Sequence, residues 1–127
     1  MSNLRDDTAA AMIGFAGPRE GGIDAVFLFA PELAVFSDHF PGHPILPGIL
    51  ELEMVLVALS RFFDTSVLRL VSIERAKFLG EIKPGEKIKL LADFSAFDEK
   101  KRLAVKGQLW VEGEKAAHIE LTVERDE

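Results

Sequence analysis

Residues 37–48 hold the side chains of this sequence best suited to moving a proton. Two histidines, His39 and His43, stand there among three prolines and two glycines, and an almost wholly apolar run to Phe63 follows. Because proline fixes φ and lacks an N–H donor, we expect a stiff loop. An imidazole ordinarily titrates at about pH 6.5, so His39 could serve as a base at neutral pH.

A glutamate in the apolar run after this loop is the candidate acid. If residues 48–63 form a helix, Glu53 shares a face with Ile49 and Leu56, where a carboxylate is costly without a partner. Burial there would raise its pKa toward a value useful for a general acid. Glu51 is the competitor, but it falls in the first helical turn, where the helix dipole already explains a carboxylate. We therefore favour Glu53.

Gly48 stands at the expected start of that helix. Its backbone N–H would lack an intrahelical acceptor and would suit a carbonyl oxygen that gains negative charge. A glycine that simply ends a loop is equally common. A base, a buried acid and an oxyanion donor together favour proton abstraction next to a carbonyl, with loss of a leaving group.

The sequence offers little support for other chemistries. It has no cysteine, which excludes disulfides, zinc–thiolate sites and a cysteine nucleophile. His39 and His43 make a poor metal pair, because their spacing suits a helix and Pro41-Gly42 between them forbids one. No phosphate-binding glycine motif and no nucleophile elbow is present. The net charge of −6 argues against a general nucleic-acid-binding protein.

One domain, residues 1–127, is the simplest organisation of this chain. The N-terminus lacks the layout of a signal peptide, and no apolar run reaches the roughly 20 residues that cross a bilayer. We therefore expect a cytoplasmic protein with no membrane contact. Basic residues crowd the middle of the chain and could form a rim for an acidic partner, although ordinary solvated strand faces are the commoner explanation. They are Arg69, Arg75, Lys77, Lys83, Lys87, Lys89, Lys100, Lys101 and Arg102.

The elements that must position these residues can be read from the apolar pattern. A short helix within residues 1–12, a turn-rich connection from Gly14 to Gly22 and a strand from Ile23 to Phe29 are expected first. The helix from Gly48 to Phe63 is apolar on nearly every side. Such a helix is buried, and in so small a protein this needs a sheet curled around it and a second subunit.

Four long antiparallel strands are expected after this helix. Apolar and polar residues alternate within residues 67–79, 88–96, 103–111 and 117–124, imperfectly in the first, which predicts a bulge there. Short polar turns separate the strands. The sequence therefore predicts an α+β domain in which an antiparallel sheet wraps around a long central helix, the hotdog fold.

The segment from His39 to Glu53, HFPGHPILPGILELE, closely resembles the HFPGxPxxPGVLxxE signature of the 3-hydroxyacyl-acyl-carrier-protein dehydratases of fatty acid synthesis. Residues 76–78 and 83–86 resemble that family's KF strand and its PGD turn, so the resemblance runs from Ile23 to the C-terminus. It implies a hotdog homodimer with shared active sites, with a higher oligomer left open. It also implies no cofactor, and as partner an acyl carrier protein bearing a 3-hydroxyacyl thioester.

The resemblance also implies a role for each motif residue. His39 would remove the C2 proton, the Gly48 N–H would hold the thioester oxygen, and Glu53 of the other subunit would protonate the departing 3-hydroxyl. The acyl chain would lie in an apolar tunnel at the dimer interface, and the acidic carrier protein would dock on the basic rim. The residues expected to contact substrate are Phe40, Pro47, Ile49 and Val57.

Three positions depart from the family pattern. Asp38 replaces the usual glycine before the histidine, His43 stands where arginine or lysine is frequent, and Val57 replaces a glutamine that would orient the acid. The pattern is similar to divergent dehydratases of secondary-metabolite pathways such as aryl polyene synthesis. Two alternatives stay open: a hotdog acyl thioesterase, and a non-catalytic acyl-carrier-binding partner subunit.

Overall fold

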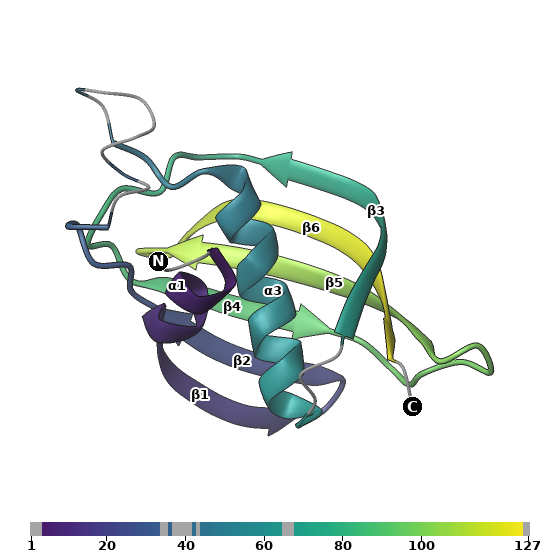
Figure 1. Cartoon of the computed structure of the whole chain (residues 1–127). Coiled ribbons are helices and arrows are strands. Elements are labelled where there is room, and N and C mark those ends of the chain that lie inside the picture. The colour runs from purple at the N-terminus through teal and green to yellow at the C-terminus, as the bar shows by residue number, and fades with distance from the viewer. Residues whose placement is uncertain (1–3, 34–35, 37–41, 43, 65–67, 126–127) are drawn as a thin grey trace.

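The computed structural model describes residues 4–33, 36, 42, 44–64 and 68–125. Six antiparallel strands form one sheet in the order β1-β2-β4-β5-β6-β3 (Figure 1). The elements in chain order are α1 (Leu4–Ala11), β1 (Met12–Arg19), β2 (Gly22–Phe27), α3 (Gly48–Phe62), β3 (Leu68–Phe78), β4 (Ile88–Asp93), β5 (Arg102–Val111) and β6 (Glu114–Arg125).

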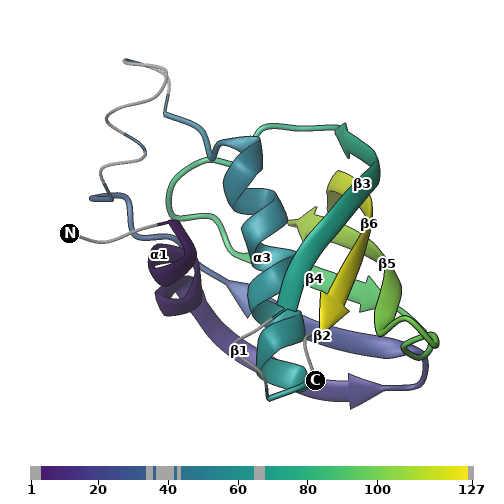
Figure 2. The same ribbon diagram turned by 45° about the vertical axis from the view of Figure 1, so that its right-hand side comes forward.

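The sheet curls around α3, which lies across its concave face (Figures 1 and 2). From Met54 to Leu59 every residue of the helix is buried, which is why the sequence there is continuously apolar. The strands facing the helix bury alternate side chains, such as Leu103, Val105 and Leu109 of β5. The predicted fold class, an antiparallel sheet wrapped around a central helix, is therefore confirmed.

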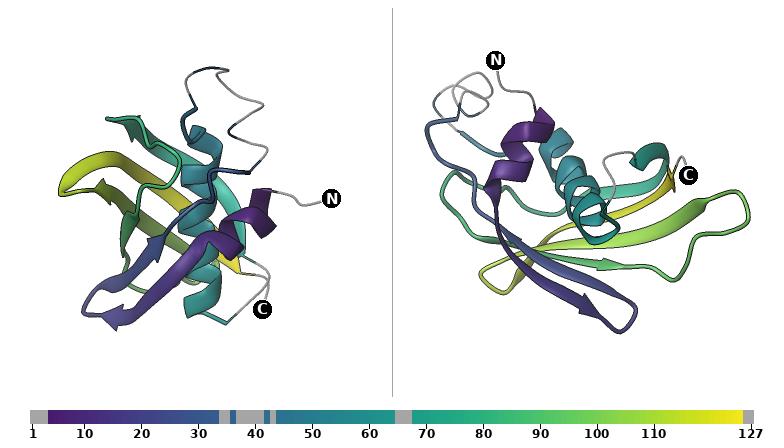
Figure 3. Two further views of the ribbon diagram at one scale, coloured as in Figure 1. Left: turned by 90° about the vertical axis from the view of Figure 1, so that its left-hand side faces the viewer. Right: turned by 60° about the horizontal axis from the view of Figure 1, so that its bottom comes forward.

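The short N-terminal helix is confirmed, and it also explains part of the burial of α3. Helix α1 packs beside α3 on the same face of the sheet, as both views in Figure 3 show. A second subunit is thus not needed to cover that side of α3. Neither described helix is long and apolar enough to cross a membrane.

The expected turn-rich connection between Gly14 and Gly22 is wrong, because Met12–Arg19 forms strand β1. Its pairing with β2 shifts register between Met12 and Gly14 and between Phe15 and Gly17, so bulges accommodate the glycines. β1 is an edge strand, where the missing N–H of Pro18 is tolerated.

Two later strands also bear on the sequence predictions. β4 ends at Asp93, short of the predicted Ala96. The predicted irregularity in β3 is confirmed by two register shifts in its pairing with β6.

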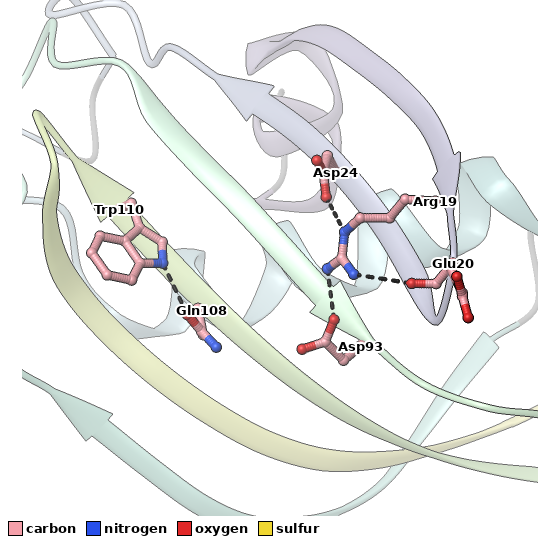
Figure 4. A network of polar contacts seen from close by, with 6 residues as sticks. All are labelled: Arg19, Glu20, Asp24, Asp93, Gln108 and Trp110. Carbon is pink, nitrogen blue, oxygen red and sulfur yellow. Dashed lines mark hydrogen bonds and ion pairs between the residues drawn. The ribbon is translucent and has the colours of Figure 1, made fainter.

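Hydrogen bonds between polar side chains connect strands β1, β2 and β4 (Figure 4). Arg19 of β1 donates from Nε to Oδ1 of Asp24 in β2 at 2.5 Å, and from Nη2 to Oδ1 of Asp93 in β4 at 2.6 Å. On β5, the indole N–H of Trp110 donates to Oε1 of Gln108 at 3.0 Å. The Arg19 contacts hold β1 at the sheet edge despite its bulges.

Gly107 in β5 sets how closely α3 approaches the sheet. A Cβ at this position would lie 3.2 Å from Cγ2 of Val55 on the helix. We expect Gly107→Val to lower the free energy of unfolding by about 1–3 kcal/mol, since the added methyl groups overpack this contact. Chemical denaturation measures the effect. Ala104→Val, on the exposed face of the same strand, is the matched control, and equal losses in both variants would argue against the close approach.

Candidate active site

A cleft of about 540 Å³ opens at the first turn of α3. Two sets of backbone hydrogen bonds hold its walls. The N–H of Leu46 donates to the carbonyl of Ile82 at 2.7 Å, and the N–H groups of Leu79 and Gly80 donate to the carbonyl of Ala116 at 2.8 and 3.2 Å. The chain that enters α3 is thereby fixed against the chain that leaves β3. The cleft is lined by Ile45, Leu46, Pro47, Gly48, Glu51, Phe78, Leu79, Gly80 and Glu81.

The start of α3 in this cleft lacks a side-chain cap among the described residues. Pro47 is the N-cap, with extended backbone (φ −65°, ψ 146°), and no side chain of the described residues caps the helix. The N–H of Gly48, in the first helical position, therefore has no intrahelical acceptor and lies at the positive end of the helix dipole. Such a donor can stabilise an oxygen that gains negative charge.

Because Gly48 has no side chain, the aromatic ring of Phe78 can pack against the start of α3. A Cβ on this residue would lie 2.9 Å from Cζ of Phe78 and 3.2–3.3 Å from two further ring atoms. Any larger residue would push the ring away from the helix start. The half-exposed ring of Phe78 thus packs against Gly48 and lines the same cleft.

The buried carboxyl of this helix is Glu51, not Glu53 as expected from the sequence. Glu51 is 4% exposed, and its Oε1 has no hydrogen-bond partner among the described residues. Burial raises the pKa of Glu51 from its usual 4.5 to about 8. The explanation of Glu51 as a first-turn carboxylate that serves the helix dipole is therefore insufficient, because desolvation outweighs the dipole here.

Glu53 lies on the side of α3 that faces α1. Its carboxylate forms an ion pair with Arg5 of α1, and its side chain is 17% exposed. Glu53 is thus less buried within one chain than expected, and Arg5 supplies the partner that a carboxylate at this position needs. Val57, one turn further on, lines a separate hollow of about 630 Å³ beside α1 together with Arg5 and Arg61.

The sequence-predicted site residues divide into three groups. Pro47 and Gly48 line the cleft, and Ile49 next to them is half exposed. Glu53 and Val57 lie on the α1 side and are not brought to the cleft within one chain. The remaining two, His39 and Phe40, lie outside the described residues. Across the described residues, no group of three His, Cys, Asp or Glu side chains could hold a metal ion.

Sequence reasoning missed Phe78 and Arg5 at these surfaces, and it set Glu51 aside in favour of Glu53. Phe78 could have been found, because it belongs to the KF motif that resembles the dehydratase strand. Glu51 could have been found from its spacing of three residues after Gly48, which puts both on one helical face. Arg5 carries no sequence signal, since its contact with Glu53 joins residues far apart in the chain.

The raised pKa of Glu51 predicts how stability depends on pH. Between pH 4.5 and about 8 the folded protein keeps this proton and the unfolded chain releases it, so the free energy of unfolding falls as pH rises. The fall is at most about 1.4 kcal/mol per pH unit. Glu51→Gln cannot titrate, so its denaturation midpoints, measured in urea across this range, should vary less with pH than those of the unmodified chain. If the plots of midpoint against pH run parallel for the two proteins, the raised pKa of Glu51 is contradicted.

Comparison with known proteins gives the family. The family model described as ApeI-like, ApeI dehydratase, matches residues 18–123. The 3-hydroxyacyl-[acyl-carrier-protein] dehydratase FabZ of Chlamydia trachomatis serovar L2 is 37% identical over 73 residues, 51% of this chain and 48% of that protein. FabZ of Campylobacter fetus is 34% identical over 89 residues, 61% of this chain and 55% of that protein. The chain spans about half the length of the curated relatives that it matches.

A solved structure supports the fold independently. The dehydratase heterocomplex ApeI:P from Xenorhabdus doucetiae superimposes with a TM-score of 0.74 at 24% identity, over 90% of this chain and 96% of that one. The likeness in fold and the family match over residues 18–123 agree with each other. The chain belongs to the ApeI-like family.

Proposed function

We propose that the chain dehydrates (3R)-3-hydroxyacyl thioesters on acyl carrier protein to trans-2-enoyl thioesters, as a cytoplasmic enzyme of fatty acid or related polyene biosynthesis. The observation that carries this proposal is the start of α3 without a side-chain cap, which lies in a cleft and follows His39 and His43 in the sequence. Membership of the ApeI-like family and similarity to FabZ dehydratases favour the same reaction.

Each motif residue takes one part of the reaction. His39 removes a proton from C2 of the acyl chain, and the electron pair moves toward the thioester carbonyl. The Gly48 N–H holds the carbonyl oxygen while charge accumulates on it. Glu53 protonates the 3-hydroxyl, the C3–O bond breaks, the C2=C3 bond forms, and water leaves. To act as this acid, Glu53 must carry a proton in place of its ion pair with Arg5.

The division of the motif residues between two surfaces favours a shared site. Gly48 lines the cleft near β3, whereas Glu53 faces α1, so one chain does not bring its own pair together. A second copy that presents Glu53 to the cleft of the first would complete the site. We therefore propose a homodimer in which each active site takes its acid from the partner.

Strand β3 is the surface proposed to pair the two copies. It is the last strand of the sheet, and an unprotected edge of this kind invites pairing with another strand. Large apolar side chains are exposed along it and just beyond it, which is typical of an interaction surface. They are Val71, Ile73, Phe78 and Leu79.

We expect Ile73→Arg to convert the dimer to a monomer and to abolish dehydration, because a charge would be buried in the interface. Light scattering after size-exclusion chromatography measures the mass. Ile13→Arg is the control: Ile13 is 55% exposed against 43% for Ile73, but it lies on β1 at the opposite edge of the sheet. If the Ile13 variant dissociates and the Ile73 variant does not, the interface lies elsewhere.

The carrier protein is proposed to approach the open mouth of the cleft. Lys77 and Lys83 are exposed and flank in sequence the lining residues from Phe78 to Glu81. These cations could pair with the acidic surface of a carrier protein and raise its rate of association. The phosphopantetheine arm would then deliver the thioester to the first turn of α3.

The direct test incubates the chain with a 3-hydroxyacyl thioester on acyl carrier protein. Rising absorbance of the conjugated enoyl thioester supports the proposal. Release of free thiol would support an acyl thioesterase instead. Absence of turnover in the pure chain, with turnover after addition of a second hotdog subunit, would support a partner role, as in the dehydratase heterocomplex from Xenorhabdus doucetiae.

A further inference from the structure

The cleft at the first turn of α3 contains an acid that the mechanism above does not use. Glu51 follows Gly48 by three residues, so both lie on one face of the helix. Helical side chains lean toward the N-terminus, which carries the Glu51 carboxyl back over the first turn. Gly48 and Glu51 line the same cleft.

The state of Glu51 fits a ligand that accepts a hydrogen bond. The residue is 4% exposed, and its Oε1 is buried without a partner among the described residues. Buried polar groups are nearly always hydrogen-bonded, so an orphaned one at a cleft calls for an explanation. Because burial raises the pKa of Glu51 to about 8, the carboxyl keeps its proton at neutral pH and has an O–H to donate.

The surroundings reinforce the neutral form. Among the residues that line the cleft, the other ionisable side chain is that of Glu81, and the rest are apolar residues and glycines. No cation is among the described residues that line the cleft, so none of them favours the Glu51 carboxylate. Desolvation in this apolar cleft disfavours the ionised form of Glu51.

We propose that the Glu51 carboxylic acid donates a hydrogen bond to the substrate's thioester carbonyl oxygen, as a second oxyanion donor beside the Gly48 N–H. This rests on the proposed dehydratase function and adds a residue to it. An acid kept neutral by an apolar site is a known type of oxyanion donor. The Glu51 proton stays on Glu51 throughout, so the bonds made and broken are unchanged.

Two variants separate this role from its alternatives. Glu51→Leu removes the donor and keeps the volume roughly constant, and we expect kcat to fall by about 10²–10³-fold, the effect of losing one oxyanion donor. Glu51→Gln keeps an N–H donor, and we expect a loss of less than about tenfold. A loss of only a few-fold in the leucine variant, or equal losses in both variants, would overturn the proposal. Equal losses would indicate that Glu51 transfers its proton.

The pH profile supplies a second readout. Above about pH 8 the unmodified enzyme loses its donor as Glu51 ionises, whereas Glu51→Gln does not. The ratio of kcat/KM in the variant to kcat/KM in the unmodified enzyme, which reports ionisation of the free enzyme, should therefore rise with pH across this range. A constant ratio would contradict donation by the neutral acid.

A measurement without turnover distinguishes failure of this proposal from failure of the dehydratase assignment. The titration of the Glu51 carboxyl can be followed by NMR with ¹³C-labelled glutamate, with Glu51→Gln to assign the signal. Butyryl-pantetheine has the thioester but no 3-hydroxyl, so it cannot be dehydrated. Its binding should move the Glu51 midpoint to higher pH, because it stabilises the protonated form. An unmoved midpoint with bound thioester overturns the proposal, whereas a moved midpoint without dehydration of any 3-hydroxyacyl thioester overturns only the reaction.

Discussion

His39→Ala is expected to lower the rate of dehydration by about 10²–10⁴-fold, the contribution of a positioned general base. The imidazole is the group proposed to take the C2 proton, and alanine has nothing to accept it. The enoyl thioester formed from a 3-hydroxyacyl carrier protein is followed by its absorbance. The apparent affinity of the His39→Ala variant for substrate should change little, because His39 stabilises the transition state and not the bound ground state.

His43→Ala is the matched control for this variant. Both histidines precede α3 in the sequence and both lie outside the described residues. Replacing either one removes an imidazole from the same stretch of the sequence. We expect the His43 variant to keep the greater part of the activity. Both variants should keep the melting temperature of the unmodified chain. Wild-type-like turnover of the His39 variant would refute the assignment of the base.

The central helix could be predicted because it is a long, almost continuously apolar run, and most of the strands because apolar residues recur at every second position. In β5 the structure buries Leu103, Val105 and Leu109, as that spacing requires. Strand β1 could not be predicted in this way. Its glycines and Pro18 are typical of turns, and it is a strand only because β2 and the Arg19 contacts hold it.

The two glutamates of α3 show where sequence reasoning about the site ends. Helical spacing assigns Glu53 to an apolar stripe, but the stripe faces α1, whose Arg5 supplies a counter-ion. The same spacing assigns Glu51 to the first turn, where it looks ordinary until β3 and the chain after it cover it. Burial of a side chain depends on which elements pack over it, and that is a property of the fold.

Glu53→Gln is expected to be as damaging as His39→Ala, yet a mixture of the two inactive variants should recover activity. Gln cannot donate the proton that the leaving hydroxyl needs. If each site takes His39 from one subunit and Glu53 from the other, a heterodimer of the variants contains one intact site and one doubly defective site. Random exchange of subunits should then restore about a quarter of the unmodified activity, since half of the dimers are mixed and each has one site of two.

Arg5→Ala is the control that separates the acid from its ion pair. Like Glu53→Gln, it removes the ion pair between Arg5 and Glu53, but it keeps the Glu53 carboxyl. A partly exposed ion pair of this kind contributes at most about 1 kcal/mol to stability. We expect this variant to stay active, because Glu53 no longer has to give up a counter-ion to hold a proton.

Native mass spectrometry can confirm that mixed dimers of the His39→Ala and Glu53→Gln variants form. If they form and remain inactive, Glu53 and His39 serve the same subunit, and the packing of α1 against Glu53 must open before each turnover.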